Sequence, residues 1–169
     1  MRMSRTARRD WHRKPFPTRA WLAGVGLLVV MLGIAVLPPF VSPSLRAVLM
    51  EGFSSVCHQL PGRSVHHHGV QLAVCDRCLG IYVGLVLGSA ATRWGRAVWE
   101  RVRAWGLFPL AMVLVPVGID WLAPVLGLWE SVPLSRSLTG LLAGIGGGGV
   151  VADRILTSIG SEAPSAGDG

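Results

Sequence analysis

Residues 75–88 read CDRCLGIYVGLVLG and combine a cysteine pair with a glycine repeat. Two residues separate the cysteines, so on a helix both sulfurs belong to about one turn. The glycines then recur at every fourth position: Gly80, Gly84 and Gly88. A helix with such a stripe can approach another helix backbone closely, as helices in membranes often do. This stretch therefore predicts a tightly packed membrane helix that begins at a cysteine site.

A second glycine stripe lies nearer the C-terminus, at the same spacing: Gly140, Gly144 and Gly148. Asp76 precedes the first stripe by four residues, and Arg136 precedes the second by four. The four-residue step keeps nearly the same helix face, so aligned parallel stripes would place the two charges opposite each other. The sequence predicts a contact between the two helices and an Asp76–Arg136 pair. In the alternative, Arg136 pairs with Asp120 or Glu130, and Asp76 stays in water.

Composition places the chain among membrane proteins. Of its 169 residues, 51% are hydrophobic and 15% are charged, whereas soluble domains carry about 25% charged residues. The predicted fold is all-α, a polytopic membrane helical bundle with about four transmembrane helices. The expected spans are residues 20–40, 74–91, 105–126 and 134–155, within one membrane domain at 20–157. The first apolar run exceeds the ~7–15 residues of a secretory signal, which indicates an anchor.

The segments outside these spans have their own patterns. Residues 1–19 carry seven basic residues and one acid, which predicts a disordered cytoplasmic tail attracted to anionic lipids. Residues 42–60 have helical periodicity and open an outer loop that extends to residue 73. They predict an amphipathic helix at the membrane interface, or a helix packed against the bundle. The small polar residues at 158–169 predict a disordered tail.

The distribution of basic residues predicts the orientation. Twelve of the sixteen lie on one side of the spans: seven in the N-terminal tail, four in the loop after the second span, and Arg154. The other four are Arg46, Arg63, Arg77 and Arg136. Because cytoplasmic loops carry the basic excess, both termini should be cytoplasmic and the cysteines should face outward from the plasma membrane. The arginines flank apolar runs, so the expected partner is the lipid bilayer and no nucleic acid; a homo-oligomer and the substrate are left open.

The three cysteines of the chain and the histidine after the first form the candidate site: Cys57, His58, Cys75 and Cys78. A Cys₃His set suits tetrahedral zinc or another thiophilic metal. Adjacent side chains point in different directions, so the histidine can instead come from the run His66, His67 and His68. That run is equally consistent with a solvated loop that holds no metal.

A second chemistry fits the same cysteines. A CxxC pair at a helix start suits thiol redox work, because the helix N-terminus lowers a thiol pKa. The alternative function is a membrane thiol–disulfide oxidoreductase that uses Cys75 and Cys78, with Cys57 nearby and a quinone as electron acceptor. The layout is similar to that of quinone-coupled disulfide-forming enzymes, but the chain lacks their second cysteine pair. A structural disulfide or inert thiols form a third interpretation, and whether the protein is an enzyme stays open.

Asp120 is an ionisable residue within the third predicted span. Facing lipid would cost at least ~2.5 kcal/mol, so Asp120 should face the bundle interior and have a partner. Pro116 also leaves the carbonyl of Met112 without its helical donor. In the alternative, the helix ends at Ile119 and Asp120 merely caps it at the interface.

Two groups of residues form a pattern that extends beyond the cysteines. The first is Cys57-His58-Gln59, Pro61, Arg63-Ser64, Cys75, Arg77-Cys78, Gly80-Ile81-Tyr82 and Gly84. The second is Asp120, Glu130-Ser131, Arg136 and Thr139-Gly140. This pattern resembles a family of small prokaryotic integral membrane proteins, catalogued as domain of unknown function 2085. The resemblance spans residues 57–144 and implies a multi-pass protein with an important Cys/His site. It does not indicate which activity the protein has. Its supporting polar residues are Arg63, Arg77, Asp120, Glu130 and Arg136, and Asp76 departs from the small residue expected there.

Overall fold

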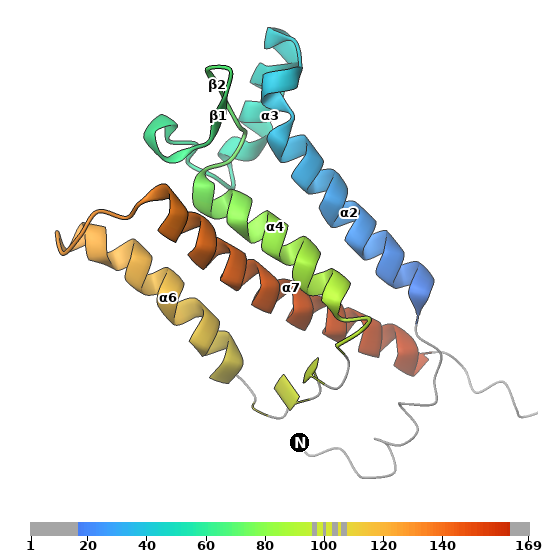
Figure 1. The fold of residues 1–169 in the computed structure, drawn as a ribbon. Helices are drawn as coiled ribbons and strands as arrows, with labels where there is room; N and C mark the ends of the chain where they lie inside the picture. Colours follow the sequence, from blue (N-terminus) through green and yellow to red (C-terminus); the bar gives the residue numbers. More distant parts are fainter. Residues whose placement is uncertain (1–16, 96–97, 100, 103–104, 106–107, 163–169) are drawn as a thin grey trace, which may run out of the picture.

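The computed structural model describes residues 17–95, 98–99, 101–102, 105 and 108–162, which are mostly helical (Figure 1). The long helices are α2 (Thr18–Val36), α3 (Pro43–Ser54), α4 (Asp76–Ala91), α6 (Phe108–Val125) and α7 (Pro133–Glu162). The shorter elements are η1 (Pro38–Phe40), η2 (Pro61–Arg63) and an antiparallel hairpin of β1 (His66–His67) and β2 (Val70–Gln71). The expected all-α class is confirmed. The hairpin was not predicted.

The helices α2, α4, α7 and α6 lie beside one another in that order (Figure 1). Helix α4 contacts α2 on one side and α7 on the other, and α6 packs against α7. The starts of α4 and α7 lie at the same end of this row, together with α3 and the hairpin (Figure 1). The cysteines and the buried charges described below gather at this end.

Helices α4 and α7 touch backbone to backbone. A Cβ atom added to a glycine of the first stripe would lie 2.2–2.3 Å from a backbone oxygen of α7, at Gly80, Gly84 and Gly88. The reciprocal distances to α4 oxygens are 2.2–2.5 Å, at Gly140, Gly144 and Gly148. Gly80 faces Ser137, and Gly88, two turns later, faces Ile145. The two helices are therefore parallel neighbours, as expected from the sequence.

Several helix boundaries differ from the expected ones for local reasons. Helix α2 ends at Val36 rather than residue 40, because Pro38 and the proline after it lack the N–H that a continuing helix needs. Arg46 donates hydrogen bonds to the backbone carbonyls of Pro38, at 3.1 Å, and Val41, at 3.4 Å. Helix α4 begins at Asp76 rather than residue 74, since the residue before it has an extended backbone.

Helix α3 also ends early, at Ser54 rather than residue 60. It buries Phe53 and leaves Val48 67% exposed, so it packs on the bundle and keeps an outward apolar face as an interfacial helix does. Helix α7 continues to Glu162, and the disorder predicted for 158–162 is therefore wrong. The rest of that predicted tail and residues 1–16 lie outside the described residues.

One described helix, α2, is long and apolar enough by itself to cross a membrane. The apolar part of α6, Ala111–Val125, is shorter. Helix α4 has 16 residues, and α7 has 30 residues that include charged ones. Among the described helices, α2 is therefore the one that indicates a membrane protein by length and composition. The expected number of four spans stays a prediction.

Replacing Gly84 by alanine should lower the free energy of unfolding by about 1–3 kcal/mol, as overpacking typically does. The new methyl group would meet the oxygen of Leu141 and the Cα of Gly144, which cannot rotate away. Unfolding by SDS in mixed micelles, followed by circular dichroism, measures the loss. Gly24→Ala in α2 is the matched control, since nothing lies within 4 Å of its added Cβ. Equal stability of the two variants would contradict the close helix contact.

Candidate metal centre at the start of helix α4

The three cysteines converge at the N-terminal end of α4. Their Sγ atoms all lie within 4.8 Å of one another. Cys75 directly precedes α4, Cys78 lies in its first turn, and Cys57 follows α3. Cys57 is 4% exposed, whereas Cys75 and Cys78 are half-buried. The expectation that Cys57 approaches the CxxC pair is confirmed.

Gln59 holds the loop that brings Cys57 to this place. Its side-chain amide donates to the carbonyl of Met50 at 2.7 Å and to the carbonyl of Ala73 at 2.9 Å. Its own carbonyl accepts a hydrogen bond from the Gln71 amide at 2.6 Å. Gln59 has φ of 49°, a left-handed conformation that costs a non-glycine residue about 1 kcal/mol or more. The turn at Gln59 therefore persists because three hydrogen bonds tie it to α3 and to the stretch from Gln71 to Ala73.

Backbone hydrogen bonds and apolar packing complete the surroundings of the sulfurs. The Cys75 N–H donates to the Cys57 sulfur at 3.2 Å. The Ala73 N–H donates to the carbonyl of Ala35 at 3.0 Å, which attaches the loop to the end of α2. Cys57 belongs to a buried apolar cluster with Ala35, Phe53, Ala73 and Val74.

Neighbouring groups lower the pKa of the Cys75 thiol. A hydrogen bond with the Cys78 side chain holds the pKa of Cys75, the residue before α4, well below its usual range. The backbone N–H groups of Cys78 and Arg77 lower it further, against the burial that raises it. A thiolate is thus favoured at Cys75, which is the form that binds metals and attacks disulfides.

The histidines lie apart from this group. Among the described residues, the cluster of potential ligand atoms contains the cysteines alone, so His58 is not part of it. His58 is exposed. The hairpin histidines are exposed too, and the His67 ring packs against Phe40 at 5.2 Å and against His68 at 4.2 Å. The structure therefore assembles three of the four ligands proposed from the sequence.

Asp76 and Arg136 form a buried ion pair between α4 and α7. Their side chains are 5% and 9% exposed, and Arg136 Nη2 lies 3.2 Å from Asp76 Oδ2. Arg136 also donates to the carbonyl of Ser131 and, at 3.3 Å, to its hydroxyl oxygen. The pair predicted from the two stripes is confirmed, and the alternative with Asp76 in water is wrong.

Asp120 forms a second pair, with Arg77. Helix α6 continues past Asp120, which is 5% exposed, so the alternative ending at residue 119 is wrong. The Ser135 hydroxyl donates to Asp120 Oδ1 at 2.7 Å. Arg77 Nη2 also lies 3.4 Å from the Asp120 carbonyl oxygen. That carbonyl lacks its helical donor because the residue four positions later, Pro124, has no N–H.

The sequence predicted that Asp120 has a partner, but it did not indicate that this partner is Arg77. Arg77 follows Asp76 directly, and successive helical residues differ by about 100° in direction. With Asp76 facing α7, the next side chain turns towards α6. Arg63 and Glu130, the other two proposed supporting residues, are exposed.

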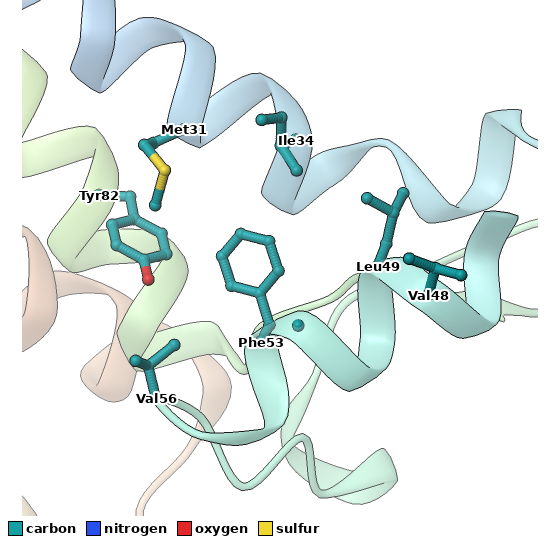
Figure 2. A pocket seen from close by; sticks show the side chains of 8 residues that line it. Met31, Ile34, Val48, Leu49, Phe53, Val56 and Tyr82 are labelled. Atoms are coloured by element: carbon teal, nitrogen blue, oxygen red, sulfur yellow. The ribbon is translucent and has the colours of Figure 1, made fainter.

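An apolar cavity of about 290 Å³, widely open to the outside, lies between α2, α3 and α4 (Figure 2). Its lining consists of Met31, Ile34, Val48, Leu49, Gly52, Phe53, Val56 and Tyr82. The rings of Phe53 and Tyr82 meet edge to face, with centroids 6.3 Å apart. Both residues also belong to the apolar packing around the cysteines, so the cavity and the cysteine group share a wall.

Comparison with known proteins identifies the family of the chain. Residues 57–149 match the family described as "Predicted membrane protein (DUF2085)". The chain belongs to this family. The match begins at Cys57 and takes in both ion pairs, while α2 and α3 precede it. The resemblance proposed from the sequence is confirmed.

Two archaeal relatives of this DUF2085 protein are described as uncharacterised. A protein of Methanocaldococcus jannaschii is 34% identical over 105 residues, which are 62% of this chain and 64% of the relative. A protein of Methanothermobacter thermautotrophicus is 34% identical over 94 residues, which are 56% of this chain and 82% of the relative. This chain thus spans less than two thirds of the first relative's length. No solved structure matches the chain.

Replacing Arg136 by methionine should destabilise the protein by about 3–5 kcal/mol, because Asp76 would keep a buried charge without its partner. The double variant Asp76→Asn/Arg136→Met should regain part of that loss, since neither charge is then left alone. SDS unfolding measures both values. Glu130→Gln, at an exposed site, should change stability by less than about 0.5 kcal/mol. A double variant no more stable than the single one would show that the pairing of charge is not the cause.

Proposed function

We propose that this protein is a multi-pass membrane protein whose three cysteines bind a thiophilic metal ion, with zinc as the first candidate. The convergence of all three Sγ atoms within 4.8 Å carries the proposal. Thiolates that share a tetrahedral zinc at ~2.3 Å lie ~3.8 Å apart. The cysteines are free thiols, so a small adjustment of their side chains would bring them onto one ion.

The proposed membrane arrangement has four spans, formed by α2, α4, α6 and α7. Two features support it: these helices lie side by side, and basic residues are more frequent at one side of the predicted spans. With that side cytoplasmic, both termini are inside. The metal site then faces outward, near the level of lipid headgroups. The two ion pairs support this placement, because charges near the hydrocarbon are stabilised when they pair within a bundle.

Thiol oxidation is the second candidate function. The observation that favours it is the lowered pKa of Cys75, combined with the proximity of Cys78. The dithiol of Cys75 and Cys78 would become a disulfide, and the two electrons and two protons would reduce a quinone to a quinol. The apolar cavity beside Phe53 and Tyr82 is where a quinone could approach the sulfurs (Figure 2).

Purified protein should contain one equivalent of zinc or another thiophilic metal per chain. The ion should be lost from each of the variants Cys57→Ser, Cys75→Ser and Cys78→Ser. Elemental analysis of detergent-solubilised protein, combined with a thiol count, measures this. His58→Ala is the matched control and should retain the ion, because His58 lies outside the cysteine group.

The same preparation separates the two candidate functions. A metal-free protein with a Cys75–Cys78 disulfide that reforms when quinone is added would favour the oxidoreductase. Metal content that persists in all three cysteine variants would place the ion elsewhere and contradict the proposed site.

Replacing Gln59 by glycine should weaken metal binding by about 10–100-fold, as the loss of groups that orient ligands typically does. Glycine tolerates φ of 49°, so the variant removes the hydrogen bonds from the side-chain amide to the carbonyls of Met50 and Ala73 without adding backbone strain. Competition with a chromophoric chelator measures the affinity. His66→Ala, on the exposed hairpin, should leave the affinity unchanged. An unchanged affinity in Gln59→Gly would show that Cys57 finds its position without this clamp.

A further inference from the structure

We infer that a metal ion held by the three cysteines keeps one exchangeable coordination position, which water occupies at rest and a neutral nitrogen donor from outside the chain can take. The inference rests on the proposed metal binding and specifies its type. Zinc in proteins takes four donors in a tetrahedron. The group provides three sulfurs within 4.8 Å of one another.

The histidines proposed as fourth ligand lie away from the sulfurs. In the part of the chain that the structure describes, the ligand group contains cysteines alone. His58 is exposed although the adjacent Cys57 is 4% exposed, so the two side chains point in different directions. The His67 ring packs on Phe40 at the hairpin.

The nearby carboxylates already have partners. Asp76, which is adjacent to Cys75, lies 3.2 Å from the Arg136 guanidinium. Asp120 accepts hydrogen bonds from Ser135 and Arg77. Recruiting Asp76 to the metal would leave the buried Arg136 without its carboxylate, and recruiting Asp120 would do the same to the partly buried Arg77, which is destabilising.

Burial shows where an external donor would enter. Cys57 is nearly inaccessible and lies among Phe53, Ala73 and Val74, so its side of the site is closed. Cys75 and Cys78 are half-buried, so solvent reaches the group from their side. An ion bound here would be closed on the Cys57 side and open next to the CxxC pair.

Charge selects the class of donor. Three thiolates and a divalent ion have a combined charge of −1, and the two ion pairs add no net charge. An anionic fourth ligand would make the combined charge of the ion and its ligands −2 beside an apolar cluster, which is costly. A neutral donor such as imidazole avoids this cost. Three protein ligands with an open position are typical of catalytic zinc, whereas structural zinc sites are closed.

Cobalt substitution tests the open position in the full chain. Reduced protein in micelles, loaded with one equivalent of Co²⁺, should show the ligand-field bands of tetrahedral cobalt and a sulfur-to-cobalt charge-transfer band. Imidazole should shift the ligand-field bands along a one-site saturation curve. Azide at equal concentration should shift them less. The charge-transfer band should keep its intensity, because all three cysteines stay bound.

Three results would overturn the inference without contradicting the proposed metal binding in the absence of imidazole. Bands that do not respond to imidazole would mean that the chain itself supplies a fourth ligand. A stronger response to azide would refute the charge argument, and loss of the charge-transfer band would mean that imidazole strips the ion.

Histidine variants provide the matched control for the cobalt experiment. His58→Ala and the triple variant His66→Ala/His67→Ala/His68→Ala should reproduce the parent spectrum and its imidazole response. A changed spectrum in either variant would identify the fourth ligand as a histidine of the chain and overturn the inference. A protein that binds no cobalt would instead contradict the proposed function, and the inference would fall with it.

Discussion

Backbone atoms of α4 and α7 meet along two facing rows of glycines, at distances that leave no space for a Cβ atom. Such contact is possible only in steps of four residues, because each glycine must face a particular stretch of the opposite backbone. In the observed register, Gly84 faces Gly144. The positions of the charges and the cysteines at the end of α4 follow from that register.

The charged residues at this end stabilise one another. Arg136 lies in the first turn of α7, where the positive end of the helix dipole disfavours a cation. Asp76 offsets this and gains from the dipole of its own helix, at whose start it lies. Arg77 neutralises Asp120 between α4 and α6. Each acid is thus neutralised by a base from another helix, which limits the cost of burial.

The two residues between the cysteines of the CxxC pair are the ones that make these ion pairs. Asp76 is bound to α7 and Arg77 to α6, so the first turn of α4 is anchored on two sides. Residues three apart on a helix share a face, so Cys75 and Cys78 lie on the same side of the helix start, next to Cys57. The site is therefore built on a rigid helix start, which suits chemistry that depends on the geometry of the ligands. Asp76, where the resemblance implies a small residue, has a structural role in this chain.

The sequence by itself determined the all-α class, and it predicted the contact between two helices and the Asp76–Arg136 pair. These features follow from spacing along regular helices, where a four-residue step translates directly into direction in space. Only the tertiary structure decided that Arg77 is the partner of Asp120, that Gln59 clamps the loop, and that His58 lies outside the group. Each depends on an irregular segment or on how α6 is placed against α4. No period in the sequence encodes those directions, because side chains of loops and of separate helices are brought together by packing alone.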